Sequence, residues 1–581
     1  MFTSICSQGL VKRHGVAAGA AAVVVLLALF ACVVRPAVSQ ATETGLVEGG
    51  RCATGLARSL HPILDYPTPG QGPTRATPPA NPQVGDSWFW YIWRLAAMPV
   101  ADWLSCTVRG MGDHCYVMVE DSQWNVNVNQ AQVDHIVDRF DNTSIGPHPD
   151  LGIYDINVQT FGIPPDRLDN DDRIYIMYYD FDINADGFFW SFDEYPDGSQ
   201  PWASNECEVV YINCSDNDPA GDYLIAVVAH EFEHMIHWEH DINESPWVDE
   251  GLGELAMYLY GHPDNISSFN SNPDNNLTVW NGNWADYIKT YLWSLYFYER
   301  YGGSAAIYDV VHHPLNSTQG YDAVLDLWSY TENFDDVFAD WTVANYLDDP
   351  SIGDGRWGYV GDDLPAFNHS ATHSTYPTSV PTAVVNYWAS DYVRFLSASS
   401  GLQIDFDGYD TSAFAVWALE LDPSQPTRVT RLTLDPSQMG SVTLPDVGSL
   451  YERAVMAVSH NSSLSGTTYG YQAATDVTGL AAVTPVSLRR ALLEQPVPNP
   501  FNPSVKLGLE LPADAASARL VVFDAAGRLV RTLVDGPIQG GQRAVYWDGR
   551  TDRATDAPSG TYFFRLEAGP EVAMTRATLV R

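Results

Sequence analysis

Two histidines and a glutamate in the segment HEFEH have the types and spacing of a metal site. His230 and His234 are four residues apart, and residues at this spacing on a helix lie on one face, one turn apart. Both imidazoles can therefore bind one ion, and Glu231 can hold and deprotonate a water molecule beside it. Zinc is the expected metal because it accepts three protein ligands and leaves one position open. The pattern predicts metal-assisted hydrolysis, and a chance match on a buried helix is the alternative.

His240 is the first of two candidates for the third ligand. It stands ten residues after His230, as in the metzincin pattern HExxHxxGxxH, in which a glycine lets the chain turn back to the metal. Here His237 occupies the glycine position, and its Cβ resists a left-handed turn. That class also needs a methionine turn, whereas GELAMYLYG around Met257 has a helical pattern. The sequence therefore disfavours His240.

Two carboxylates downstream are the second candidate. Glu250 and Glu254 in WVDEGLGELA are four residues apart, so one can bind the ion while the other holds a ligand imidazole through its free N–H. The segment resembles the second-helix motif of gluzincins, the superfamily of thermolysin-like proteases and zinc aminopeptidases. The resemblance implies that Glu250 is the ligand and that Glu254 supports His230, with Asp249 where the family often has Asn. An exposed carboxylate is the alternative reading of Glu250.

A wider resemblance covers roughly residues 86–350. The segments SNECEVVYINC, AHEFEHMIH, ADYIKTYLW and YYDFDINADGFFWSFDEY resemble the hyicolysin-like secreted metallopeptidases. This resemblance implies a thermolysin-like catalytic domain that acts on protein or peptide substrates, with Glu231 as general base. Gluzincins often stabilise the oxyanion with a Tyr or His from a later helix, and Tyr287 is the first choice here and Tyr291 the second. Both tyrosines can instead be plain core residues.

The alternatives to this function come from two classes. The GxMEN segment with which aminopeptidases capture a substrate's amino terminus is not visible in the sequence, which favours an endopeptidase over a zinc aminopeptidase. A catalytically silent protein for cell-surface binding or adhesion is the other alternative. The presence of Glu231 together with three plausible ligands speaks against it.

An acidic segment, DINADGFFWSFD, has a second metal-binding pattern. Its residues occupy positions one, three, five, six and twelve of an EF-hand loop, and they are Asp182, Asn184, Asp186, Gly187 and Asp193. Asp193 replaces the usual Glu, and the flanks have strand and loop patterns rather than helical ones. An acidic turn between strands is therefore the favoured interpretation, and a Ca²⁺ site is the alternative.

The elements that would position the zinc site follow from periodicity. Strand patterns CYVMVE and RIYIMYYDF come first, and a helix begins near Tyr223 with Asp222 as its N-cap. A second helix begins near Trp247, and a third lies in ADYIKTYLWSLYFYERYGG. This order predicts an α+β zincin-type domain, a mixed sheet plus active-site helices, over residues 86–350.

Two all-β domains are expected after it. Short strand patterns, among them LQIDFDG, AFAVWALEL and RAVMAVS, predict a β-sandwich over residues 375–480. Residues 491–581 predict a small immunoglobulin-like sandwich. This last segment resembles the module shared by type IX secretion sorting domains and the flagellar hook-cap immunoglobulin-like domain. The resemblance implies export or surface attachment, and a plain accessory sandwich is the alternative.

The N-terminal residues predict export. A basic start and the apolar run GVAAGAAAVVVLLALFACVV read as a signal peptide over 1–39, with an uncleaved anchor as the alternative. Residues 40–85 are rich in Pro and Gly and read as a linker or pro-segment. Outside the cytoplasm, local disulfides are expected within two short segments, Cys106 with Cys115 in a hairpin and Cys207 with Cys214. Cys52 would then be unpaired, and fully reduced cysteines are the alternative.

The net charge of the chain limits the kinds of partner that it can bind. The chain carries 30 Lys and Arg residues against 72 Asp and Glu residues, a formal net charge of −42. Such a surface repels nucleic acid and anionic lipid, so neither is expected as a partner. No segment after the N-terminal run looks transmembrane, so no membrane span is expected in the mature protein. The expected localisation is secreted or at a bacterial cell surface, with secretion machinery as a partner of the C-terminal module.

Overall fold

The computed structural model describes Cys52, Thr54, Pro79 and residues 81–581 except for short gaps. The gaps are 96–99, 200–202, 462–466, 476–491, 494–495, 512–514, 526, 539–540, 554 and 569–570. The predicted signal peptide and most of the predicted linker or pro-segment therefore lie outside the described residues. Among the described helices, none combines the length and apolar character that crossing a bilayer requires.

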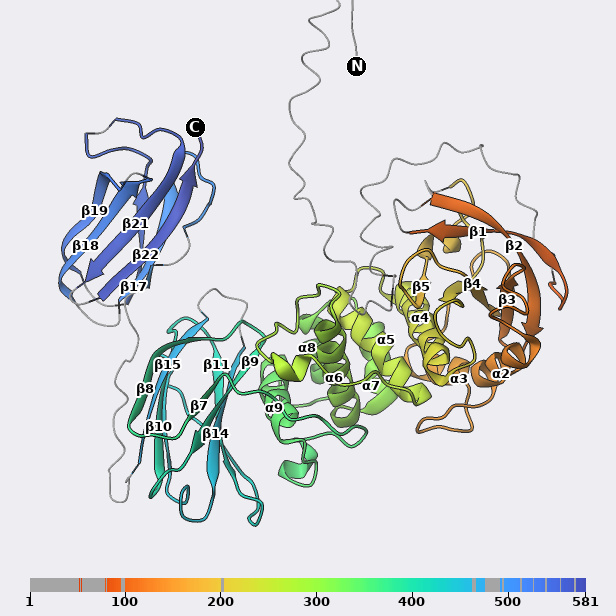
Figure 1. Cartoon of the computed structure of the whole chain (residues 1–581), viewed down its shortest axis with the longest axis horizontal. Coiled ribbons are helices and arrows are strands. Elements are labelled where there is room, and N and C mark those ends of the chain that lie inside the picture. Colours follow the sequence, from red (N-terminus) through yellow and green to blue (C-terminus); the bar gives the residue numbers. More distant parts are fainter. Residues whose placement is uncertain are drawn as a thin grey trace, which may run out of the picture. The chain divides into compact units, whose positions relative to one another are not determined.

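A mixed sheet forms the first part of the described chain (Figure 1). Its strands, in spatial order, are β1 (Ser87–Arg94), β2 (Val100–Met111), β3 (Cys115–Glu120), β4 (Ile174–Tyr179), β6 (Val209–Asn213) and β5 (Gly187–Phe189). The pairs β3–β4 and β4–β6 are parallel, and the others are antiparallel. The central strands are continuously apolar, as expected where both faces of a sheet are covered. The short strand β5 lies at one edge.

Among the described residues, two helices lie between β3 and β4 in the sequence, and six follow the last strand of the mixed sheet, as the sequence order predicts. They are α2 (Gln130–Asp141), α3 (Ile153–Thr160), α4 (Asp222–His240), α5 (Pro246–Tyr260), α6 (Trp284–Arg300), α7 (Gly303–Val311), α8 (Thr318–Leu327) and α9 (Phe334–Leu347). Figure 1 shows α4, α5 and α6 as neighbours, and α5 contacts both of the others. The three helices match the predicted positions. The N-cap of α4 is Gly221 rather than the predicted Asp222, which is the first helical residue and makes no side-chain cap.

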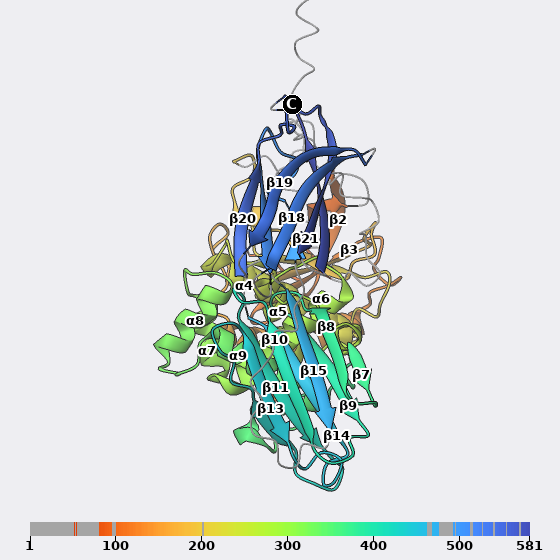
Figure 2. The ribbon, with the colours of Figure 1, turned by 90° about the vertical axis from the view of Figure 1, so that its left-hand side faces the viewer.

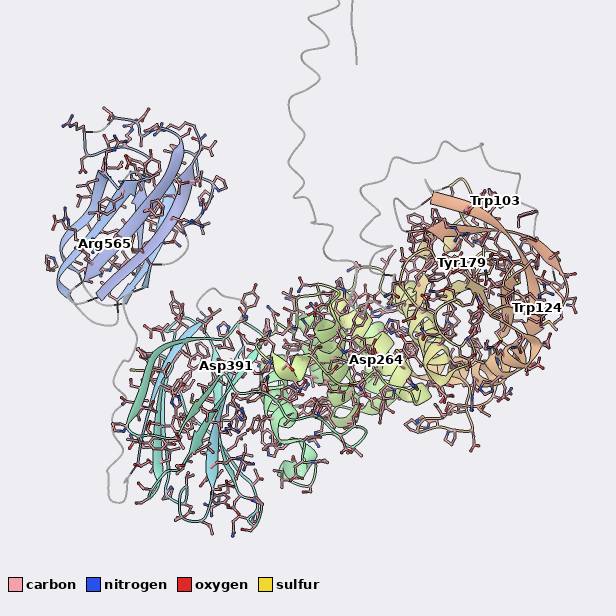
Figure 3. All side chains as sticks on the ribbon, in the orientation of Figure 1. Trp103, Trp124, Tyr179, Asp264, Asp391 and Arg565 are labelled. Carbon is pink, nitrogen blue, oxygen red and sulfur yellow. The ribbon has the colours of Figure 1, made fainter. Side chains whose placement is uncertain are left out.

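The two faces of the mixed sheet pack into separate apolar clusters. Val117 and Val119 of β3 face the helices, whereas Tyr116 and Met118 pack on the other face with several tryptophans. Tyr179, labelled in Figure 3, belongs to this second cluster, and its hydroxyl donates to the Trp93 carbonyl over 3.0 Å. This alternation is the period of two that a pleated strand imposes.

The alternation of side chains between the two faces of the mixed sheet contradicts the predicted disulfides. Neither predicted disulfide forms between the described cysteines. Cys106 and Cys207 lie in the cluster on the tryptophan-rich face, whereas Cys115 and Cys214 lie in the cluster on the helix face. The hairpin of β2 and β3 does form, but Cys106 stands opposite Glu120 rather than Cys115. Each predicted pair is therefore separated by the sheet itself.

A two-sheet sandwich follows the helical region (Figure 2). One sheet is β13 (Met439–Leu444), β10 (Leu402–Gly408), β15 (Thr468–Thr475) and β8 (Thr378–Val384); the other is β12 (Arg428–Arg431), β11 (Phe414–Leu421), β14 (Arg453–His460), β9 (Ser390–Leu396) and β7 (Ala371–His373). Inward residues of both sheets share one core. Asp391 of β9 (Figure 3) accepts a hydrogen bond of 2.7 Å from Tyr469 of β15 and so joins the sheets.

A second, smaller sandwich ends the chain. Its strands are β16 (Leu492–Leu493), β17 (Val505–Leu511) and β20 (Gly541–Trp547) in one sheet, and β19 (Leu529–Ile538), β18 (Ala515–Asp524), β21 (Gly560–Ala568) and β22 (Glu571–Leu579) in the other. Both sheets bury residues in one core around Trp547. The β-rich C-terminal region therefore agrees with the predicted pair of all-β domains.

Candidate metal centre

Close packing of α4 against α5 builds the candidate site. The ring of His230 on α4 lies directly against Gly253 of α5, where an added Cβ would stand 2.8 Å from the ring Cε1 atom. On its other side α5 approaches α6 at Gly251, where an added Cβ would stand 2.8 Å from the Thr290 carbonyl oxygen. The two glycines of DEGLGE therefore let three helices come close enough for side chains of α4 and α5 to meet.

The structure brings the predicted ligands together. The Nε2 atoms of His230 and His234 are 3.1 Å apart. Glu250 Oε2 lies 3.6 Å from the first of these nitrogens and 3.8 Å from the second. All three side chains are buried, with at most 3% of any side chain exposed. Two nitrogens and one oxygen thus converge on one point.

This donor set fits a zinc ion. A tetrahedral ion with bonds of about 2.0–2.1 Å to N and O spaces its ligand atoms about 3.3 Å apart, close to the separations seen here. The Nδ1 side of each ring faces carboxylates, which favours a proton on Nδ1 and leaves the Nε2 lone pairs available to an ion. Two lone pairs and a carboxylate at this separation repel one another unless a cation lies between them.

Acidic side chains surround the two imidazoles. Glu254 Oε1 lies 3.5 Å from Nδ1 of His230, the position that the resemblance implied. His234 Nδ1 lies 3.3 Å from Asp249 Oδ2 and 3.4 Å from Glu233 Oε2. Carboxylates in such positions can hold the rings in one orientation and would increase their basicity toward a metal ion.

His237 completes this acidic cluster. Its Nδ1 lies 3.2 Å from Glu233 Oε1 and 3.4 Å from Asp249 Oδ1. It is buried and bridges two carboxylates that also face His234. Sequence reasoning gave His237 and Glu233 no role and took Asp249 only as a departure from Asn. The helical spacing of four residues between Glu233 and His237 was the signal that could have paired these two.

Glu231 lies where a general base is needed. It is fully buried, and its Oε2 accepts a hydrogen bond of 2.8 Å from the Thr54 hydroxyl. Burial raises the pKa of Glu231 above its ordinary value, against the lowering effect of the two neighbouring histidines. The edge strand β5 passes directly over it, since a Cβ on Gly187 would stand 2.9 Å from the Glu231 Cγ atom.

The structure separates the two candidate tyrosines. The Tyr287 hydroxyl donates to the carbonyl of Cys52 over 3.5 Å, and Cys52 belongs to the metal-ligand group described next. Burial, with Glu250 next in effect, raises the pKa of Tyr287 well above its ordinary value, so the hydroxyl keeps its proton. Tyr291 instead donates to Asp362 over 2.9 Å. Tyr287 is therefore the tyrosine placed near the candidate metal position.

Cys52 is the residue that sequence reasoning missed. Its Sγ joins His230, His234 and Glu250 in a group whose potential ligand atoms all lie within 4.8 Å of one another. The only sequence signal was that Cys52 remained over when the other cysteines were paired. His240 is not in this group; its ring lies against His312, and its Nε2 contacts the Ile163 carbonyl at 3.0 Å.

The structure does not bring the calcium-loop residues together. Asp182 accepts from the Leu95 amide, Asp186 accepts from Tyr223 and Asn217, and Asp193 accepts from the Asn205 amide and Tyr211. Asn184 is exposed. Among the described residues, the groups of potential metal ligands include none of these four side chains. The geometry is that of an acidic turn, and calcium binding remains a prediction.

Comparison with known proteins identifies the last module. Residues 499–570 match the family model of the FlgD Ig-like domain, so the C-terminal sandwich belongs to that domain type. No curated protein matches the chain.

Two solved structures from the type-IX secretion system are distantly similar to the chain. PorZ, an essential surface component of the type-IX secretion system of Porphyromonas gingivalis, is 19% identical with a TM-score of 0.12, over 15% of this chain and 11% of that one. Latent PorU from the same organism is 13% identical with a TM-score of 0.17, over 37% of this chain and 19% of that one. The chain thus spans a small part of either protein. At these TM-scores neither likeness supports an inference.

Proposed function

We propose that the chain is a secreted zinc-dependent endopeptidase with a zincin-type catalytic domain. The observation that carries the proposal is the convergence of His230, His234 and Glu250 beside the buried carboxylate of Glu231. A silent binding protein would have no need to keep a buried, acid-supported imidazole pair and a carboxylate at this cost in desolvation.

A zinc ion held by these three residues would supply Lewis acidity that polarises the peptide carbonyl and makes water a stronger acid. Glu231 would take the proton of the attacking water and later give it to the leaving amine. Burial raises its pKa, which makes Glu231 a stronger base for the first of these steps. The Tyr287 hydroxyl would donate a hydrogen bond to the developing oxyanion.

Strand β5 supports a peptide as the substrate. It lies at the edge of the mixed sheet and passes over Glu231. An extended peptide can add to such an edge as a further strand, with backbone hydrogen bonds that do not depend on sequence. Binding along the strand needs no free amino terminus, which supports an endopeptidase rather than an aminopeptidase.

The C-terminal domain supports the proposal that the enzyme acts outside the cytoplasm. We propose that the FlgD Ig-like module, residues 499–570, attaches the enzyme to the cell surface or to secretion machinery. The high negative charge of the chain suits a soluble exterior. Loss of the enzyme from the cell surface on deletion of this module is the expected result.

Casein hydrolysis with and without a zinc chelator, together with metal analysis, tests the proposal. Glu231→Gln should retain about one zinc per chain but lose hydrolysis by a factor on the order of 10² or more, the size expected for a general base. The matched control is Glu239→Gln on the same helix, whose carboxylate instead pairs with Arg167 at the surface. Because Cys52 lies at the site, Glu231→Gln is compared with its parent in both the wild-type and the Cys52→Ser protein. Equal hydrolysis with and without Glu231→Gln in the Cys52→Ser protein would show that the site is not a peptidase centre.

A further inference from the structure

Cys52 lies at the candidate metal site, although the residues that it contacts there are far from it in the sequence. Its Sγ is 3.4 Å from His234 Nε2 and 3.5 Å from Glu231 Oε2. It belongs to the same ligand group as His230 and Glu250. Cys52 precedes the mixed sheet, within the segment that the sequence identifies as a linker or pro-segment.

The spacing is that of a fourth ligand. With Zn–S of about 2.3 Å and Zn–N of about 2.0–2.1 Å, sulfur and nitrogen in a tetrahedral site are about 3.5 Å apart. The Cys52 sulfur and the His234 nitrogen are 3.4 Å apart. Catalytic zinc sites keep this fourth position open, whereas structural sites close it with a protein ligand. With Cys52 in place the site is closed.

The residues around Cys52 also contact the other groups that the reaction needs. The Thr54 hydroxyl donates to Glu231 Oε2 and accepts from the Phe189 amide of β5, each over 2.8 Å. The Cys52 carbonyl accepts from Tyr287, and Cys52 forms a parallel β-bridge with Gly187. One short piece of chain therefore contacts the base, the oxyanion donor and the edge strand together.

We propose that Cys52 is the fourth protein ligand of the ion and that its segment keeps the enzyme latent by occupying the position of water and substrate. This inference rests on the proposed function. The thiol releases its proton to solvent as the sulfur binds the ion, and no bond between heavy atoms of the protein changes. Cleavage of the chain after Cys52, or a reagent that blocks the thiol, frees the fourth position.

The other described cysteines cannot act as the fourth ligand. Cys106, Cys115, Cys207 and Cys214 are buried in the two clusters on the faces of the sheet, each at most 4% exposed. Cys52 is half-buried and is a free thiol. A thiol reagent can therefore reach Cys52 while the other four cysteines stay protected.

Cobalt substitution of the full chain tests the ligation directly. Co²⁺ in the site should show both the visible bands of a tetrahedral ion and a near-ultraviolet charge-transfer band from thiolate. Cys52→Ser should keep the visible bands and lose the charge-transfer band. The matched control, Cys207→Ala, removes a buried thiol from the tryptophan-rich face of the sheet and should keep both.

The outcomes separate this inference from the function on which it rests. A cobalt site with the same charge-transfer band in wild type and Cys52→Ser would overturn the inference and leave the metal site standing. Absence of cobalt or zinc binding in every variant would overturn the proposed function as well. Casein hydrolysis by Cys52→Ser should exceed that of wild type about tenfold or more, because tenfold corresponds to only about 1.4 kcal/mol of lost ligation. Equal rates would contradict latency.

A second measurement covers the case in which Cys52→Ser does not fold. Wild-type protein is treated with a thiol-specific disulfide reagent with zinc present or removed, and the modified peptide is identified. Bound zinc should slow modification of Cys52 about tenfold or more, since only the fraction of thiol that leaves the ion reacts. A rate that does not depend on zinc would overturn the inference.

Discussion

Nδ1 of His234 lies 3.3 Å from Oδ2 of Asp249, while Nε2 of the same ring faces the Nε2 atom of His230 at 3.1 Å. The carboxylate therefore favours the tautomer of His234 that carries its proton on Nδ1 and leaves Nε2 available to a metal ion. Asp249 directly precedes Glu250, so one turn of α5 supplies both a proposed ligand and the support of another proposed ligand. Such support contributes to metal affinity without contact with the ion.

Removal of this support should weaken metal binding. We expect Asp249→Ala to reduce zinc affinity about 10–100-fold, measured by competition with a chromogenic chelator. Asp249→Asn keeps an acceptor oxygen for the Nδ1–H and should lose less. If Asp249→Ala binds zinc as tightly as wild type, Glu233, which lies 3.4 Å from the same nitrogen, holds the ring alone.

Gly253 sets the distance between α4 and α5. Gly253→Ala places a Cβ 2.8 Å from the His230 ring, closer than real Cβ contacts come, so the ring or the helix must move. We expect zinc content below half of wild type and a thermal transition lowered by several degrees, consistent with an overpacking cost of about 1–3 kcal/mol. Calorimetry and metal analysis measure the two effects.

Gly560→Ala is the matched control, because no atom lies within 4 Å of its added Cβ. It should leave zinc content unchanged. Normal zinc content in Gly253→Ala would mean that α5 can shift without moving Glu250, which would contradict the close packing on which the site depends.

The sequence predicted that these side chains would meet, because helical spacing brings residues together without reference to the rest of the fold. His230 and His234 share one helix face, and Glu250 and Glu254 share another, so only the approach of α4 to α5 had to be supplied by resemblance. Asp249 and His237 were missed because their role depends on where two helices face each other, which neither helix specifies alone.

The cysteines show where local reasoning failed. Short spacing suggested that Cys106 pairs with Cys115, yet a strand alternates its side chains between faces, and register placed Glu120 opposite Cys106. The contact of Cys52 was missed for the opposite reason. Its partner His234 is 182 residues away, and no periodicity within one element reports a contact at that separation.

Tyr287 and Tyr291 offer a matched pair for the oxyanion role. We expect Tyr287→Phe, made in the Cys52→Ser protein so that no thiolate occupies the fourth metal position, to lower kcat about 10²–10³-fold, as loss of an oxyanion donor does. Zinc content should not change. Tyr291→Phe removes only the hydrogen bond to Asp362 and should leave kcat within about threefold while costing about 0.5–1.5 kcal/mol of stability.

Steady-state kinetics on an extended peptide, with zinc measured on the same samples, checks this pair. Similar kcat losses in both variants would point to a packing effect of α6. A rise in KM with unchanged kcat in Tyr287→Phe would assign Tyr287 to substrate binding instead of the reaction step.

His460 of β14 should make the central sandwich sensitive to acid. Its ring is fully buried, and neither ring nitrogen has a hydrogen-bond partner among the described residues. Burial lowers the pKa of His460 from 6.5 to about 4. The unfolded chain therefore takes up a proton at a higher pH than the fold does, so the stability that neutral His460 provides is lost as pH falls from about 6.5 toward 4.

The loss between about pH 7.5 and about pH 5 should be about 2 kcal/mol at this site. His460→Phe removes the titration and keeps an apolar ring beside Phe414, whose ring centroid is 4.8 Å away. As pH falls from about 7.5 to about 5, the free energy of unfolding of His460→Phe should therefore rise by about this amount relative to that of wild type. Denaturant unfolding at each pH, followed through the transition of the sandwich, measures the difference.

Asp391 on the neighbouring strand β9 acts with the opposite sign. Burial raises its pKa from 3.8 to about 6, so its protonation favours the fold as pH falls through 6. Asp391 therefore partly offsets His460, and wild type shows only the difference between them. Asp391→Asn removes the stability that protonation of Asp391 adds, so the stability of the sandwich should fall more steeply with falling pH. His460→Phe should make this fall shallower. The same slope in both variants would mean that neither group governs the acid response, and carboxylates outside the sandwich would then have to account for it.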